Sequence, residues 1–199
     1  MPKIMISLLV LLFLFTYSDG LAHDHTNTIT SDSTTQRDEH MLVKYTAYNM
    51  WANNELATWL SGATEEDINQ EIESSFSSIR KTMMHIWNAE YIWLRVIKDE
   101  AMDDAPNKVF QGDKDALIEG WLQASEDFHT HIASMSPAEL KAVKPNKGRE
   151  GFTAIADMIH HCMNHSTYHR GQLITMGRQI GLFDPPRTDF IYYVGLHKN

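Results

Sequence analysis

The segment that decides the fold runs from Phe152 to Gly181 and reads FTAIADMIHHCMNHSTYHRGQLITMGRQIG. Its larger apolar residues recur at helical intervals, and at about 100° per residue they gather on one side of a helix. These residues are Phe152, Ile155, Ile159, Leu173 and Ile180. Glycine, here at position 181, is common just past a helix end. We therefore predict a long amphipathic helix from about Phe152 to Ile180.

Three more segments show the same helical period. They run from about Asp38 to Leu60, from about Ser75 to Lys98 and from about Lys114 to Met135. A short extra turn is predicted at residues 136–139, where a serine, a proline and a glutamate have the spacing of a helix N-terminus. We find no run of alternating residues that would make a convincing strand. Four long helices with modest connections predict an all-α protein, a four-helix bundle.

Composition narrows the function classes. The 199 residues carry a formal net charge of −9, and 43% of them are hydrophobic, which suffices to build the core of one domain. No cluster of lysine and arginine provides the basic face that phosphate contacts require, so we expect no nucleic-acid partner. Cys162 is the only cysteine, which rules out an intramolecular disulfide and a cysteine-rich zinc site.

Residues 1–22 are typical of a signal peptide. Lys3 supplies a positive start, residues 4–15 are almost entirely apolar, and Gly20-Leu21-Ala22 offers the small residues that a signal peptidase reads. The apolar run is shorter than the roughly 20 residues of a membrane-spanning helix. We predict export to the periplasm or the cell exterior, with no membrane attachment in the mature form. An uncleaved membrane anchor is the alternative.

Two further parts follow the predicted signal peptide. Residues 23–38 are rich in polar side chains and have no apolar period, so we predict a disordered leader. Residues 39–199 are predicted to form the bundle domain.

Histidine is the residue type that points to chemistry, with eleven in the chain. His161, His165 and His169 follow one another at intervals of four in the predicted helix 152–180, which places neighbours about 6 Å apart. His169 falls inside the apolar stripe and His165 at its edge, whereas His161 lies further out toward solvent. We expect His165 and His169 to reach one metal ion from one helix. The alternative is a pair of core-edge histidines that bind nothing.

A third ligand is expected from the predicted helix 75–98. His85 lies where the apolar surface of that helix gives way to its polar face, with Ala89 and Ile92 nearby. Three imidazoles with an open position are typical of catalytic rather than structural metal sites. Imidazole suits Zn, Ni, Fe and Cu alike, so the predicted cofactor is a divalent transition metal of unassigned identity.

Several motifs resemble those of the DinB family of metal-binding four-helix bundles (DinB/YfiT-like). They are YNMWAN at residues 48–53, SFSSI at 75–79 followed by His85-Ile86 and Trp93, NHSTYHRGQL at 164–173, and Asp189-Phe190-Ile191. The resemblance extends from about His40 to Gly195. It implies a histidine triad made of one residue from the second long helix and two from the fourth, here His85, His165 and His169.

The sequence departs from the family pattern in two ways. Tyr168 occupies the place of the first of two adjacent histidines that usually precede Arg-Gly-Gln. Family members are also mostly cytosolic, whereas this chain is predicted to be exported. The family name refers to induction by DNA damage and implies no contact with DNA.

The resemblance implies a metal-dependent enzyme of the hydrolase or thiol S-transferase type, because related bundles are thiol-dependent S-transferases or isomerases. A non-catalytic divalent-metal-binding stress protein is the alternative, and a purely structural bundle is a third interpretation. Glu90 is the only carboxylate on the predicted helix 75–98, and five positions beyond His85 it is expected to point away from the ion. Enzymatic activity is therefore left open.

No catalytic residue is assigned from the sequence. Arg170 and Gln172 follow His169 closely, and we leave open whether they form a salt bridge and a polar helix face or contact a substrate. A small-molecule substrate and a homodimer are retained as candidate partners.

Overall fold

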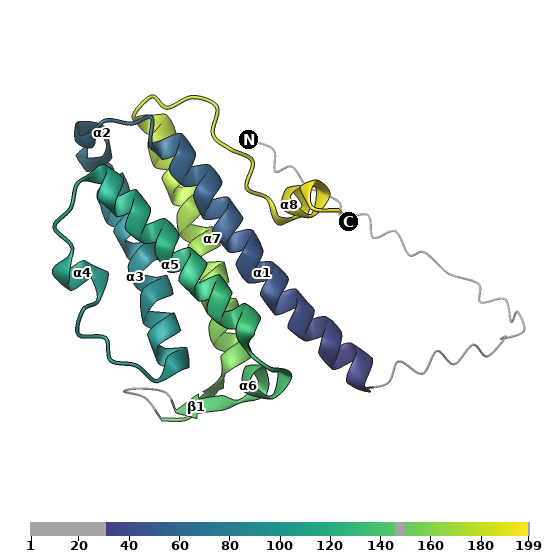
Figure 1. The fold of residues 1–199 in the computed structure, drawn as a ribbon. Coiled ribbons are helices and arrows are strands. Elements are labelled where there is room, and N and C mark those ends of the chain that lie inside the picture. The colour runs from purple at the N-terminus through teal and green to yellow at the C-terminus, as the bar shows by residue number, and fades with distance from the viewer. Residues whose placement is uncertain (1–30, 146–149, 199) are drawn as a thin grey trace, which may run out of the picture.

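Four long helices form the bundle in the computed structural model, which describes residues 31–145 and 150–198. They are α1 (Ser31–Leu60), α3 (Ile79–Lys98), α5 (Lys114–Ser134) and α7 (Ile155–Gln179). Helices α1 and α3 each pack against both α5 and α7 (Figure 1). Helix α1 therefore lies diagonally opposite α3 in the bundle, and α5 lies diagonally opposite α7. The predicted all-α four-helix bundle is confirmed.

The chain direction differs from a simple alternation of up and down. The link between α3 and α5 passes through α4 (Pro106–Val109) and returns along the bundle, so α3 and α5 run in the same direction (Figure 1). Helices α1 and α7 run in the opposite direction. Helix α7 is therefore antiparallel to α3, its neighbour on the face that carries the candidate site.

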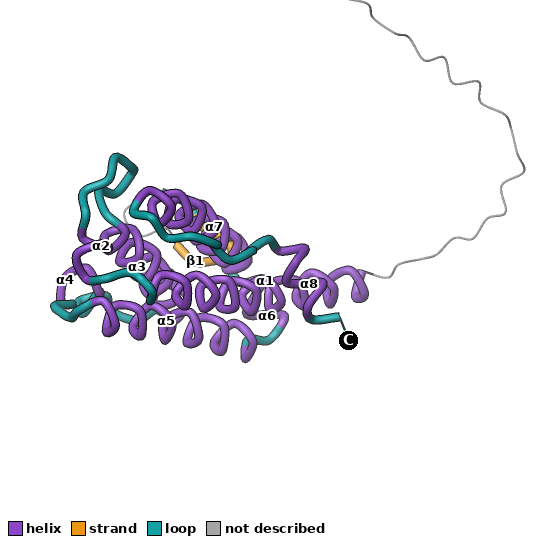
Figure 2. The backbone as a smooth tube through the Cα atoms, turned by 90° about the horizontal axis from the view of Figure 1, so that it is seen from above, coloured by secondary structure: helices purple, strands orange, loops and turns teal. Residues whose placement is uncertain are grey.

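Short elements lie at the ends of the bundle: α2 (Glu65–Asn69), α6 (Pro137–Lys141) and a hairpin of β1 (Val143–Pro145) and β2 (Phe152–Ala154). The last helix, α8 (Phe190–Leu196), packs beside α1 (Figure 1). The hairpin strands pair antiparallel with Val143 opposite Ala154, and they are the only strands among the described residues (Figure 2). Helix α6 agrees with the predicted extra turn, and the side chains of Ser136 and Glu139 cap its N-terminus reciprocally.

Three predicted helix boundaries need correction. Because β2 occupies Phe152–Ala154, α7 begins at Ile155, and a strand of three residues is too short to show alternation. Helix α3 begins at Ile79 rather than Ser75, since the Ser78 side chain accepts a hydrogen bond from the Lys81 N–H and caps the helix there.

Helix α1 begins earlier than predicted. It starts at Ser31, inside the stretch 23–38 that was predicted to be a disordered leader. Extending a helix that already exists fixes one residue per added hydrogen bond, so a polar stretch can continue it. Residues 1–30, which hold the predicted signal peptide, lie outside the described part of the chain.

Two apolar clusters fill the space between the four long helices, one toward each end of the bundle, and a third, smaller cluster lies between α1 and α8. The larger cluster includes Leu56, Leu60, Met83, Leu117, Trp121 and Leu173. The other includes Ile97, Phe128, Ile132, Ile159 and Met163. Burial of apolar surface stabilises such clusters by roughly 25 cal/mol per Å².

A glycine in α7, Gly177, allows this helix to approach α1 closely. A Cβ atom at Gly177 of α7 would lie 2.3 Å from the ring of Trp59 on α1. Only glycine therefore permits this contact between the two helices. Within the described residues, no helix has the length and apolar character needed to cross a membrane.

Candidate metal centre

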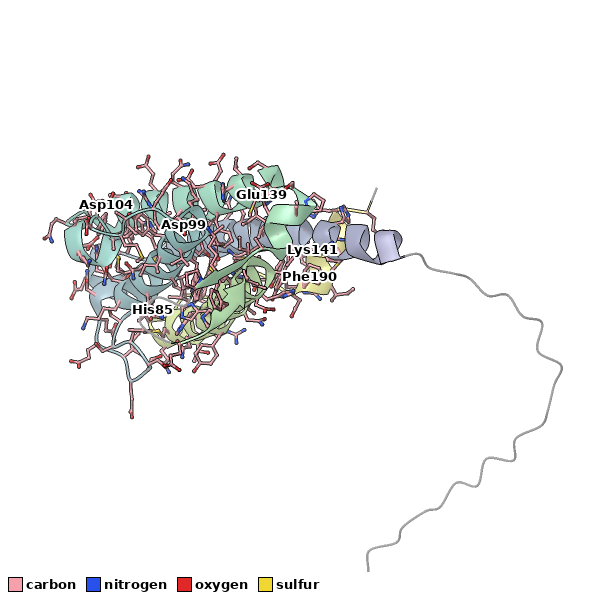
Figure 3. The ribbon with its side chains drawn as sticks, turned by 90° about the horizontal axis from the view of Figure 1, so that it is seen from below. His85, Asp99, Asp104, Glu139, Lys141 and Phe190 are labelled. Carbon is pink, nitrogen blue, oxygen red and sulfur yellow. The ribbon has the colours of Figure 1, made fainter. Side chains whose placement is uncertain are left out.

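Helices α3 and α7 bring the three predicted ligands together. His85, His165 and His169 each offer one nitrogen, and these atoms lie within 4.8 Å of one another. His85 Nε2 is 2.8 Å from His165 Nε2, although 80 positions separate the two residues in the chain. Figure 3 shows His85 beside the ribbon of α7. In the described parts of the chain, no other group of three His, Cys, Asp or Glu residues has this property.

The helical period explains the convergence. His165 and His169 are one turn apart on α7, and their ring centroids are 4.5 Å apart. The His85 ring lies across the α3–α7 interface, 4.7 Å from the His165 ring and 4.6 Å from the His169 ring. Each imidazole therefore contacts both others.

Gln172 holds His169 in one orientation. Its Oε1 is 2.7 Å from His169 Nδ1, and its Nε2 donates a hydrogen bond of 2.8 Å to Ser75 Oγ. An amide oxygen can only accept, so His169 Nδ1 is the donor, and in the neutral imidazole this leaves Nε2 with the lone pair that could bind a metal. Histidines that bind metals usually have their second nitrogen held by such a partner. Gln172 therefore acts through His169, a role that the sequence analysis left undecided.

Aromatic rings surround the histidine cluster. The Phe76 ring lies 4.2 Å from the His85 ring and 5.6 Å from the His169 ring. The Tyr168 ring meets the His169 ring edge to face at 4.9 Å and is itself 63% exposed. His169 is buried while His85 and His165 are half-buried. The cluster thus lies at the edge of the bundle, partly open to solvent.

Burial keeps two of the imidazoles unprotonated near neutral pH. Desolvation, with smaller contributions from the neighbouring histidines His169, His85 and His161, lowers the pKa of His165 from 6.5 to about 4. Desolvation and His169 also lower the pKa of His85 below its usual value. The unprotonated form is the one that binds a metal, so neither group needs to lose a proton at pH 7.

The donor set fits a divalent transition metal. It consists of imidazole nitrogens alone, which suit Zn, Ni, Fe or Cu and not Mg or Ca. Two nitrogens on one tetrahedral zinc ion lie roughly 3.3 Å apart, so only small side-chain rotations are needed. His165 faces the cluster with Nε2, and its other ring nitrogen, Nδ1, is buried without a hydrogen-bond partner within residues 31–145 and 150–198, so His165 has no counterpart of Gln172. The three histidines could therefore hold a metal ion.

His161 lies outside this group, in agreement with its expected position toward solvent. Its side chain is exposed, its ring centroid is 6.0 Å from that of His165, and its closer partner is the Trp93 ring at 5.0 Å.

Two charged residues beside the site have roles that their sequence positions did not reveal. Glu90 points away from the histidines, as expected, but its carboxylate is fully buried among side chains that donate hydrogen bonds to it. Arg170 is 1% exposed and so does not lie on a polar helix face; among the described residues it forms no salt bridge and donates to the side-chain oxygens of Asn49 and Asn53. One sequence feature could have indicated these buried partners: the two asparagines are spaced i, i+4 within the apolar stripe of α1.

Comparison with known proteins supports the same grouping. The sequence model of the DinB family matches residues 30–196. Protein DinB of Bacillus subtilis (strain 168) is 27% identical over 160 residues, which cover 76% of this chain and 92% of that protein. Protein YizA of the same organism is 25% identical over 158 residues, which cover 75% of this chain and 94% of YizA.

A solved structure supports the fold independently. The crystal structure of a DinB-like protein from Bacillus cereus ATCC 10987 superposes with a TM-score of 0.57 at 19% sequence identity. The superposition covers 68% of this chain and 89% of that protein. Because the family match spans most of the sequence and the fold agrees with it, this chain belongs to the DinB family.

Proposed function

We propose that this protein is a divalent-metal-dependent enzyme of the hydrolase or thiol S-transferase type, with the metal held by His85, His165 and His169. The observation that carries the proposal is the convergence of three imidazole nitrogens from two helices at a partly exposed edge of the bundle. No fourth His, Cys, Asp or Glu in the described chain joins this group. Sites with three protein ligands keep a position for water or substrate, whereas structural zinc sites use four.

A divalent ion bound there would supply Lewis-acid chemistry, lowering the pKa of a water or thiol at the open position. The residues of the chain supply the setting for this chemistry. Gln172 fixes the tautomer of His169, and burial keeps His165 unprotonated. Phe76 packs against two of the three imidazoles and limits the approach of solvent on that side.

One observation favours a second candidate, a non-catalytic metal-binding stress protein. The histidine group contains no carboxylate that could act as a general base. Both carboxylate oxygens of Glu90 accept hydrogen bonds in the core, so Glu90 is unavailable for this role. Without a base, the ion would have to activate its ligand unaided.

The test combines metal analysis with activity. Protein purified without a polyhistidine tag is stripped with a chelator and reloaded separately with Zn(II), Ni(II), Fe(II) and Cu(II). Each form is assayed for hydrolysis of aryl esters and for transfer of a low-molecular-weight thiol to an aryl halide. His165→Ala serves as the inactive control and His161→Ala as the matched control.

Three outcomes separate the candidates. Turnover that requires metal and disappears in His165→Ala supports the enzyme. Stoichiometric metal without turnover on either substrate class supports the metal-binding protein. Absence of tight metal binding contradicts both.

We also propose export of the mature protein and a small-molecule substrate. Export is supported by the pattern of Lys3, the apolar residues 4–15 and the small residues before position 23. Mass spectrometry of the protein from cell fractions gives the first residue of the mature chain. Recovery of the full-length chain from the cytoplasm alone would contradict the proposal.

A further inference from the structure

Buried polar side chains form a layer across the middle of the bundle, between the two apolar clusters. We call this set the central polar layer. Its members are Glu90, Arg170, Asn49, Asn53, Ser125 and Ser166. Each is at most 2% exposed, and every long helix contributes at least one of them.

Glu90 joins all four helices through its carboxylate. Oε1 accepts hydrogen bonds from Asn49 Nδ2 at 2.8 Å, Asn53 Nδ2 at 2.9 Å and Ser166 Oγ at 3.0 Å. Oε2 accepts a hydrogen bond from Ser125 Oγ at 2.6 Å. A carboxylate has about four acceptor positions, so this environment matches its full capacity.

Arg170 closes the other side of the layer. Its Nη1 donates to Asn53 Oδ1 at 2.8 Å and also to Asn49 Oδ1, while Nη2 donates to Thr167 Oγ1 at 2.8 Å. Each asparagine thus accepts from the guanidinium with its oxygen and donates to the carboxylate with its nitrogen. The two amides thus bridge the positive guanidinium and the negative carboxylate. Exchanging the oxygen and nitrogen of either amide would break its hydrogen bonds to both Arg170 and Glu90.

The layer is attached directly to the candidate metal ligands. Ser166 follows His165 in α7, and Arg170 follows His169. Both layer residues therefore lie one position beyond a ligand and point into the core, while the ligands point toward α3. Ser166 donates to Glu90 directly, and Arg170 is linked to Glu90 through Asn49 and Asn53. These bonds fix how far α7 is rotated relative to α3.

Rotation matters because metal sites tolerate little displacement. Side-chain tips lie about 5 to 6 Å from a helix axis, so a rotation of roughly 20° would move the imidazoles of α7 by about 2 Å. Metal–ligand distances hold within about 0.2 Å. Apolar contacts are non-directional and would not prevent such a rotation, whereas hydrogen bonds require defined geometry.

We infer that Glu90 and Arg170 are positioning residues for the metal site: the central polar layer sets the rotation of α7 so that His165 and His169 meet His85 on one ion. The inference rests on the proposed metal site. It assigns no contact between these two residues and the metal or substrate. Their effect passes through the helix backbone to the ligands.

The experiment uses Co(II) as a probe, because its visible spectrum reports the geometry of its ligands. Glu90→Gln keeps the shape of the side chain but turns a donor toward the asparagine and serine donors. Arg170→Met keeps an unbranched apolar stem and removes the guanidinium, with its charge and all its donors. Ile132→Ala, in the apolar cluster beyond the layer, is the matched control for loss of stability alone.

Affinity and spectrum are measured where circular dichroism shows each variant folded. We expect both layer variants to bind Co(II) about 10- to 100-fold more weakly, as for other partners of metal ligands, and to alter the visible spectrum. Ile132→Ala should leave affinity and spectrum unchanged. If Arg170→Met does not fold, the near-isosteric Glu90→Gln decides the question.

Three results would overturn the inference. In the first, both layer variants bind Co(II) with wild-type affinity and spectrum. In the second, Ile132→Ala weakens binding as much as they do, so that only stability matters. In the third, the wild-type protein binds no Co(II), and this result alone also removes the proposed metal site.

Discussion

Gln172 Oε1 lies 2.7 Å from His169 Nδ1, and the same side chain donates to Ser75 in the segment that precedes α3. The Gln172 amide therefore sets the tautomer of the candidate ligand His169. It also links His169 to the segment between α2 and α3. A metal held by the three histidines would depend on this partner as well as on the histidines themselves.

Replacing this amide should weaken metal binding without removing it. We expect Gln172→Ala to lower Zn(II) affinity about 10-fold, because His169 can then rotate and change tautomer. Gln172→Glu should retain affinity, since a carboxylate oxygen also accepts from Nδ1. Calorimetric titration measures both, with the exposed Gln179→Ala of the same helix as control. Wild-type affinity in Gln172→Ala would contradict the positioning role.

The three histidines should be individually essential for metal binding. His85→Ala, His165→Ala and His169→Ala each leave two imidazoles, and we expect each variant to lose stoichiometric metal while keeping its helical content. Elemental analysis and circular dichroism measure these two properties. His161→Ala should retain the metal, because its ring lies outside the group. Metal loss in His161→Ala with retention in His165→Ala would refute the assignment.

The site was predictable from the sequence as far as local spacing allows. His165 and His169 lie on one helix, where a period of 3.6 residues places them on the same face. His85 required a guess about which helix is the neighbour of α7, supported by the resemblance to the family. The link from Gln172 to Ser75 spans 97 positions, and no local pattern reports such a contact.

For the fold too, local patterns were predictable from the sequence, whereas contacts between distant residues were not. The four long helices followed from apolar periodicity, but the three-residue strands of the hairpin are too short to leave one. Glu90 was expected only to point away from the ion, and its burial was not predicted, because a carboxylate is rarely buried without a partner. Its partners come from α1, α5 and α7, so the sequence around Glu90 contains no sign of them.

Helix spacing at Gly177 gives a prediction about stability. In Gly177→Ala, the new Cβ would lie 2.3 Å from the Trp59 ring, so the ring or the helix must move. We expect a loss of about 1 to 3 kcal/mol in the free energy of unfolding. Gly171→Ala on the same helix meets nothing within 4 Å and should stabilise by about 0.5 to 1 kcal/mol. Urea denaturation measures both, and equal effects would contradict the close packing.

Acid should destabilise the metal-free protein through His165. Its pKa is about 4 in the folded state against 6.5 when exposed, so between these values the unfolded chain binds more protons. The contribution of His165 to the free energy of unfolding is therefore fully present above pH 6.5, and it is lost as the pH falls toward 4. The melting temperature of chelated wild-type protein should drop more steeply across this window than that of His165→Asn, which cannot titrate. Parallel curves would show that His165 binds its proton equally well folded and unfolded.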